Sequence, residues 1–87
     1  MATKRTTKID RMVGAMIRFY RAEAGLTQTK LADSLGVSFQ QVQKYERGTN
    51  RVSAGSLYVI AGVLGRVLDD FFPARRLRAI KWRRARP

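Results

Sequence analysis

Apolar residues recur at helical spacing through the first third of the chain. They lie three or four positions apart, which places them on one face of an α-helix: Val13, Met16, Ile17, Tyr20 and Ala24. Asp10 can accept hydrogen bonds from free backbone amides and so cap the start of this helix. Gly25 can end it, because glycine adopts the left-handed conformation that often follows a helix.

The next two segments are short, and each begins and ends with a capping signal. Thr27 can cap a helix that Gly36 ends, and Ser38 can cap a helix over residues 39–47 that Gly48 ends. Their predicted inward positions are Leu31, Ala32 and Leu35, then Val42 and Tyr45. Because so few residues separate the two helices, we expect them to cross steeply.

The same signals continue to residue 73. Ser53 can cap a fourth helix that Gly65 ends, and residues 68–72 predict a short fifth helix that Pro73 ends. The fourth helix turns Leu57, Ile60, Ala61 and Leu64 inward, and the core should also hold the rings of Tyr20, Tyr45 and Tyr58. The pattern therefore predicts one compact all-α domain of five helices over residues 9–72.

The connection between the second and third helices has the spacing of a helix-turn-helix. Counted from Gln28 as position 1, a small residue falls at position 5 and a glycine at position 9, which are Ala32 and Gly36. A tight turn requires both, because the two backbones approach closely there. Apolar residues fall at positions 4, 8, 10, 15 and 18: Leu31, Leu35, Val37, Val42 and Tyr45. Since size, backbone conformation and polarity are constrained together, the signal is specific.

Two stretches, GLTQTKLADSLGVSFQQVQKYERG and LYVIAGVLGRVLDDFF, resemble the Cro and phage-repressor family of helix-turn-helix regulators, also called XRE. The resemblance covers about residues 13–72. It implies a λ-repressor-like DNA-binding domain whose third helix, Phe39 to Arg47, enters the major groove. It also implies a transcriptional regulator that binds a palindromic operator as a homodimer. Val67 departs from the family, where a serine or threonine usually caps the fifth helix, so we expect that helix to start late or fray.

The outward face of the third helix carries amides as well as cations. Gln40, Gln43, Lys44 and Arg47 recur at helical spacing opposite Val42 and Tyr45. A glutamine amide offers one donor and one acceptor, which matches the N6 and N7 edge of adenine, whereas lysine attracts every phosphate alike. We therefore expect Gln40 and Lys44 to read bases, with Gln43 assisting. Phe39 either contacts a thymine methyl group or packs within the helix-turn-helix.

Phosphate contacts are expected around this helix. Thr27 begins the second helix, whose free amides can face a phosphate, and the family resemblance gives Gln28 the same role. Arg47 at the end of the third helix, and Asn50 and Arg51 in the loop after it, complete the expected set.

Glu46 lies in the last turn of the third helix, where its charge opposes the helix dipole and would repel DNA. It therefore needs a cation. The resemblance implies that this glutamate pairs with Arg21 on the first helix in a structural ion pair.

The net charge of +12 suggests an anionic partner, but most of it lies in the tails. Residues 9–72 hold eight of the 18 Lys and Arg and all six Asp and Glu, which leaves only +2 there. The other cations lie in a basic N-terminal arm, residues 1–8, where Lys4 and Arg5 could reach around the duplex, and in a basic C-terminal tail, residues 73–87. That tail could be disordered or form a further helix through Leu77, Ile80 and Trp82.

Catalysis is not expected. The chain has no cysteine and no histidine, and its six carboxylates are scattered, so no coherent active site or cofactor site is apparent. Asp69 and Asp70 are adjacent, but dipole partners at a helix start explain them more simply than a metal site. The longest apolar run is too short to cross a bilayer. We therefore expect a soluble cytoplasmic protein of bacterial or phage type, associated with the nucleoid and without membrane contact.

Two alternatives remain open from the sequence. The helix-turn-helix could serve as an antitoxin or bridging module that binds a small protein partner. The tails alone could instead make the chain a general binder of polyanions such as RNA or anionic lipid.

Overall fold

The computed structural model describes residues 6–73. Within this range the chain forms four α-helices and one short 3-10 helix and has no strand: α1 (Lys8–Glu23), α2 (Gln28–Leu35), α3 (Phe39–Arg47), α4 (Ala54–Leu64) and the 3-10 helix η1 (Leu68–Phe71). The all-α prediction is confirmed for the described residues. Lys4, Arg5 and the tail residues Leu77, Ile80 and Trp82 lie outside them, so the roles of the arm and the tail stay predictions.

The predicted boundaries of α2, α3 and α4 are confirmed. The side-chain oxygens of Thr27, Ser38 and Ser53 each accept a hydrogen bond from the backbone amide three residues later. Gly36, Gly48 and Gly65 follow the three helices with φ angles of +70°, +74° and +68°. Glycine adopts this left-handed region without steric cost, so each helix ends where its sequence indicated.

The predicted start of α1 is wrong. The helix begins at Lys8, and its N-cap is Thr7 rather than Asp10. The Thr7 side chain accepts from the Asp10 amide, while the Asp10 carboxylate accepts from the Thr7 amide at 2.8 Å, so the two form a capping box. At the other end, Ala24 is the C-cap and is exposed rather than inward.

The expected fifth α-helix is also wrong for the described residues, because the chain forms the 3-10 helix η1 in its place. Val67 precedes η1 and gives no side-chain cap, and its own amide donates to the carboxylate of Asp70 at 3.0 Å. The carbonyl oxygen of Asp70 accepts from the hydroxyl of Tyr20 at 3.3 Å. With Pro73 close behind, the segment ends after one turn.

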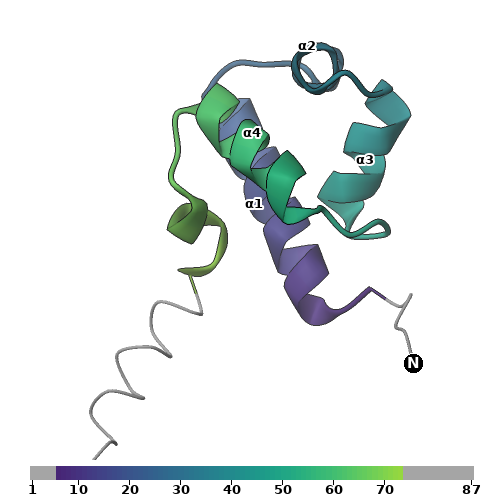
Figure 1. The fold of residues 1–87 in the computed structure, drawn as a ribbon, viewed down its shortest axis with the longest axis vertical. Helices are drawn as coiled ribbons and strands as arrows, with labels where there is room; N and C mark the ends of the chain where they lie inside the picture. Colours follow the sequence, from purple (N-terminus) through teal and green to yellow (C-terminus); the bar gives the residue numbers. More distant parts are fainter. Residues whose placement is uncertain (1–5, 74–87) are drawn as a thin grey trace, which may run out of the picture.

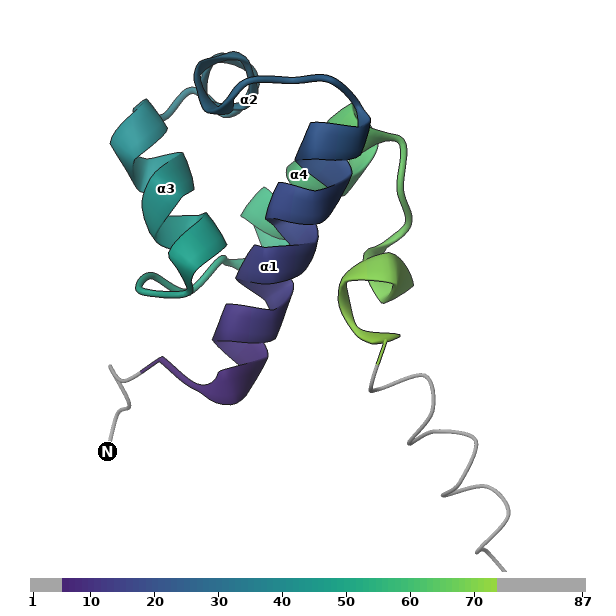
Figure 2. The same ribbon diagram turned by 180° about the vertical axis from the view of Figure 1, so that it is seen from behind.

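The helices enclose one core. Helix α1 packs against α3, α4 and η1, while α2 packs against α3 and α4. In Figures 1 and 2, α4 lies along the upper part of α1 in the middle of the domain, α2 lies at the top and α3 lies at the side. The buried apolar side chains come from every element: Val13, Ile17, Leu31, Ala32, Val42, Leu57, Ile60, Ala61, Leu64 and Phe71. None of the helices in residues 6–73 is long and apolar enough to span a bilayer.

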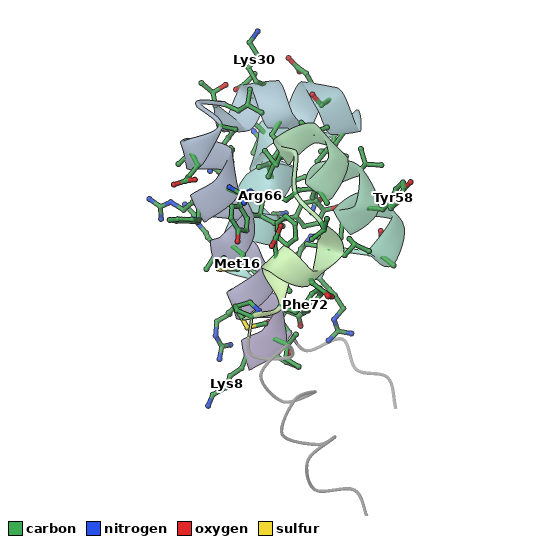
Figure 3. The ribbon with its side chains drawn as sticks, turned by 90° about the vertical axis from the view of Figure 1, so that its left-hand side faces the viewer. Lys8, Met16, Lys30, Tyr58, Arg66 and Phe72 are labelled. Carbon is green, nitrogen blue, oxygen red and sulfur yellow. The ribbon has the colours of Figure 1, made fainter. Side chains whose placement is uncertain are left out.

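Two of the three tyrosines expected in the core pack against it. Tyr20 and Tyr45 are partly buried, whereas Tyr58 is 71% exposed and points away from the domain (Figure 3). The ring of Tyr20 packs edge-on against Phe71, and the guanidinium of Arg66 lies 4.3 Å from its centroid. Tyr58 therefore belongs to the surface of α4.

Candidate nucleic-acid interface

The outward face of α3 is open to solvent. Gln40, Lys44 and Arg47 are exposed, and Phe39 is 43% exposed, while Val42 on the opposite side is fully buried. Gln43 differs, because it is partly buried toward α1 and α2. No described part of the chain buries Phe39, Gln40 or Lys44, so a ligand can reach these three side chains.

Close backbone packing holds α3 against α1. A Cβ added to Gly14 would overlap the carbonyl oxygen of Tyr45 and lie 2.8 Å from that of Glu46. One added to Gly48 would lie 2.6 Å from the Cα of Arg11. Sequence reasoning missed the role of Gly14, although a glycine within a helical pattern is a recognised sign of close packing.

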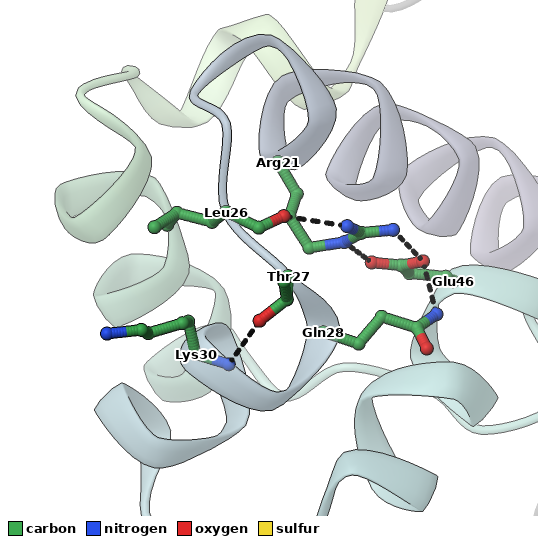
Figure 4. Close-up of polar contacts among 6 residues, drawn as sticks. All are labelled: Arg21, Leu26, Thr27, Gln28, Lys30 and Glu46. Carbon is green, nitrogen blue, oxygen red and sulfur yellow. Dashed lines mark hydrogen bonds and ion pairs between the residues drawn. The ribbon is translucent and has the colours of Figure 1, made fainter.

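A polar network joins α1, α2 and the end of α3 (Figure 4). The Arg21 guanidinium donates from Nε to Oε2 of Glu46 at 2.6 Å and from Nη2 to Oε1 at 3.1 Å. Its Nη1 donates to the carbonyl oxygen of Leu26 at 2.8 Å, and Nε2 of Gln28 donates to Oε1 of Glu46 at 3.0 Å. The structure thus brings Arg21 and Glu46 together, and adds Gln28 to the pair.

Because this network is buried, it strongly favours the observed packing of α1, α2 and α3. The side chain of Glu46 is only 3% exposed, and its two oxygens receive three hydrogen bonds. Removing one member of such a buried pair costs about 3–5 kcal/mol, because the remaining charge loses its partner. Arg21 neutralises a carboxylate that would otherwise oppose an anionic ligand near α3, and Gln28 adds a hydrogen bond to it.

The expected phosphate contacts lie at two places. Thr27 and Gln28 begin α2, where the Thr27 hydroxyl accepts from the Lys30 amide at 3.0 Å and the Gln28 amide nitrogen binds Glu46. Asn50 and Arg51 follow α3, and the Nε of Arg51 lies 3.3 Å from both carboxylate oxygens of Asp10. Arg51 is therefore tethered to the start of α1, with half of its side chain exposed.

The adjacent carboxylates at η1 do not form a metal site with a third acid. Asp70 stabilises the start of η1 through the Val67 amide. Within residues 6–73, no three acidic side chains gather closely enough to hold a metal ion.

Two short helices joined through a glycine turn, with the second exposed along its polar face, define a helix-turn-helix domain. A helix-turn-helix family profile matches residues 17–71. The chain belongs to this family of XRE-type transcriptional regulators. The resemblance that the sequence suggested is confirmed.

Individual similarities agree with this assignment. An HTH-type transcriptional regulator from Sinorhizobium medicae is 48% identical over 69 residues, which cover 79% of this chain and 50% of that relative. The clp gene regulator ClgR from C. glutamicum has a TM-score of 0.71 at 31% identity, over 75% of this chain and 84% of that one. The biofilm regulator SinR, solved in complex with DNA, has a TM-score of 0.63 at 27% identity, over 68% and 95%. The chain spans half the length of the curated relative it matches.

Proposed function

We propose that this protein is a sequence-specific regulator that binds duplex DNA and reads the major groove with α3. The observation that carries the proposal is the solvent-exposed polar face of α3, held rigidly against α1 by Gly14 and by the Arg21–Glu46 pair. The similarity to SinR, whose structure contains DNA, supports the same partner.

The chemistry of α3 suits base edges. The Gln40 amide can pair with N6 and N7 of adenine, and the Lys44 ammonium can donate to O6 and N7 of guanine. Gln43 assists from the edge of the same face, and Phe39 can contact a thymine methyl group. Thr27, Gln28, Arg47, Asn50 and Arg51 fix the orientation of the domain through phosphates, which carry no sequence information.

We further infer that two copies bind a palindromic operator. Support comes from the apolar surface that α4 and η1 leave exposed, formed by Tyr58, Val59, Val63, Val67 and Leu68. A second copy of the chain would cover it. Two copies related by a twofold axis would place their α3 helices about 34 Å apart, one turn of DNA, so that both enter the same face of the duplex.

Selection of preferred duplexes from a random DNA pool, followed by titration of variants, tests the groove-reading role. Gln40→Ala and Lys44→Ala should each weaken the preferred duplex by about 1–3 kcal/mol and relax preference at one base position. The matched control is Lys30→Ala, an exposed lysine of α2 that points away from the polar network (Figure 4). If Lys30→Ala changed base preference as much as Lys44→Ala, α3 would not be the reading element.

A further inference from the structure

Helix α1 carries a second apolar stripe, on the side that faces away from α3. Four apolar residues recur three or four positions apart, which places them along one face of the helix: Ile9, Met12, Met16 and Phe19. Gly14, which packs against α3, lies two positions from Met12 and from Met16, a rotation of about 200° around the helix. The stripe and the contact with α3 therefore lie on opposite sides of α1.

The rest of the described chain covers this stripe incompletely. Ile9 and Phe19 are 54% and 52% exposed, and Met12 and Met16 between them are only partly buried. The ring of Phe19 packs edge-on against Tyr20, with 5.3 Å between the two ring centroids, so its exposed surface is held in place. A contiguous apolar face of this kind typically marks an interface, whereas single exposed apolar residues are ordinary.

The described range ends beside the stripe. The 3-10 helix η1 packs against α1, and Figures 1 and 2 show it on the side of α1 opposite to α3. Met16 and Phe72 both pack against the core, and Figure 3 shows them on the same face of the domain. Pro73 follows directly, so residues 74–87 continue the chain from a point next to the stripe.

We propose that residues 74–87 pack against the α1 stripe of the same molecule, with Leu77, Ile80 and Trp82 as the contacting side chains. These three are the large apolar residues of the C-terminal tail. The stripe extends about 15 Å along α1, and fourteen residues reach about 21 Å even in a helix, so the tail is long enough. Contact removes apolar surface of both partners from water, which is the main favourable contribution to such packing.

The charges beside the stripe suit a basic segment, and the tail carries seven Lys and Arg. Glu23 in the last turn of α1 lies 3.6 Å from Arg66, and half of its side chain is still exposed. Two further acids, Asp69 and Asp70, belong to η1. Arg18 lies on the other side of α1, toward α3, where it would repel a cationic segment. A docked tail therefore keeps its cations near acidic side chains and away from the proposed reading face of α3.

Trp82 is the only tryptophan of the chain, so its fluorescence reports on the tail in the full-length protein. A packed indole is shielded from acrylamide, so we expect a quenching constant at least about threefold lower in the native protein than in urea. Unfolding followed by this fluorescence should have the same urea midpoint as unfolding followed by circular dichroism. Equal quenching of the native and unfolded proteins would overturn the proposal.

Variants of the stripe locate the contact. Ile9→Gln and Phe19→Gln should each raise the native quenching constant, and the two together should bring it close to the value in urea. Both side chains are exposed in the domain, so circular dichroism should show that the helices are kept. The matched control is Val59→Gln with Val63→Gln on the exposed side of α4, which should leave quenching unchanged. If only the α4 pair released Trp82, the tail would cover another surface and the proposal would be wrong.

Dilution distinguishes packing within one molecule from packing on a second copy. An intramolecular contact does not depend on protein concentration, so the quenching constant should stay the same over about a hundredfold dilution. A constant that rose on dilution would show that the tail binds a second copy, contrary to the proposal.

Stability gives a check that does not use fluorescence. Trp82→Ala should lower the urea midpoint measured by circular dichroism, because it removes a packed ring. Phe19→Gln should then lower the midpoint less in the Trp82→Ala background than in the wild type, since two residues in contact do not contribute independently. A midpoint that Trp82→Ala left unchanged, or strictly additive effects of the two changes, would mean that the two side chains do not meet.

Discussion

Gly14 is the residue whose replacement should damage the domain most directly. A methyl group there would meet the backbone carbonyls of Tyr45 and Glu46, which cannot move without shifting α3. We expect Gly14→Ala to lower the free energy of unfolding by about 3 kcal/mol, the upper range for overpacking, because backbone atoms must give way. Urea denaturation followed by circular dichroism measures the loss.

The control is Gly55→Ala in α4, where an added Cβ meets nothing within 4 Å. The same chemical change in open space should cost no stability, since alanine favours helix. If Gly14→Ala and Gly55→Ala changed the free energy of unfolding by the same amount, α1 and α3 would not pack closely at Gly14.

Gly14 and Glu46 illustrate what sequence could and could not predict at this scale. The outward face of α3 followed from helical spacing alone, because Val42 fixes which side is inward. The partner of Glu46 required the family resemblance, since no local pattern relates positions 21 and 46. The hydrogen bond from Gln28 to Glu46, and the position of Arg18 next to this network, depend on how α1, α2 and α3 pack together. Such contacts are set by tertiary packing and leave no periodic trace.

At the scale of single elements, the capping box of α1 gives a prediction about pH. Burial of Asp10 opposes its ionisation, but hydrogen bonds from the Thr7 amide and hydroxyl and from Arg51 outweigh it and lower the pKa of the carboxyl. A carboxyl whose pKa is lower in the folded state stabilises the fold above its unfolded pKa, about 3.9. That contribution disappears as the pH falls through the folded pKa.

We therefore expect Asp10→Asn to destabilise the domain by about 1 kcal/mol at pH 7, because the Asp10 carboxylate accepts from the Thr7 amide and its charge is favoured in the first turn of α1. As the pH is lowered through the folded pKa, the wild-type carboxyl should become protonated, so the difference between the two proteins should shrink. Urea midpoints at pH 7 and at successively lower pH values below about 3.9 measure it, with Asp33→Asn on the exposed face of α2 as the control. A difference that stayed constant with pH would mean that the ionised form of Asp10 does not stabilise α1.

Elements with complete capping signals were predicted most accurately. A capping Thr or Ser precedes each of α2, α3 and α4, and a glycine follows each helix. These local signals are enough to predict where the three helices begin and end. The start of α1 was misplaced because Thr7 and Asp10 are both good caps, and only their reciprocal hydrogen bonds decide between them. The five-helix count failed where Val67 supplies no cap and the chain forms one 3-10 turn.

At the scale of the whole molecule, the exposed apolar surface of α4 and η1 bears on assembly. Tyr58 and Val67 are 71% and 61% exposed, and Val59, Val63 and Leu68 lie around the same apolar hollow. Exposed apolar side chains are common singly, but a contiguous group of this kind typically marks an interface. If a second copy covers this group, binding to two half-sites should be cooperative.

Val63→Glu tests that arrangement, because it places an unpaired charge in the interface while the side chain is exposed in the single domain. We expect sedimentation equilibrium to show association weakened at least tenfold, because an unpaired charge buried between two copies costs about 3–5 kcal/mol. Affinity for a single half-site should stay the same, while binding to a duplex with both half-sites should lose its cooperativity.

Ile9→Glu makes the same change at an exposed apolar residue on α1, outside the surface formed by α4 and η1, and should leave association intact. Equal effects of the two changes would mean that the α4 and η1 surface does not join two copies, and the spacing of half-sites would then depend on another part of the chain.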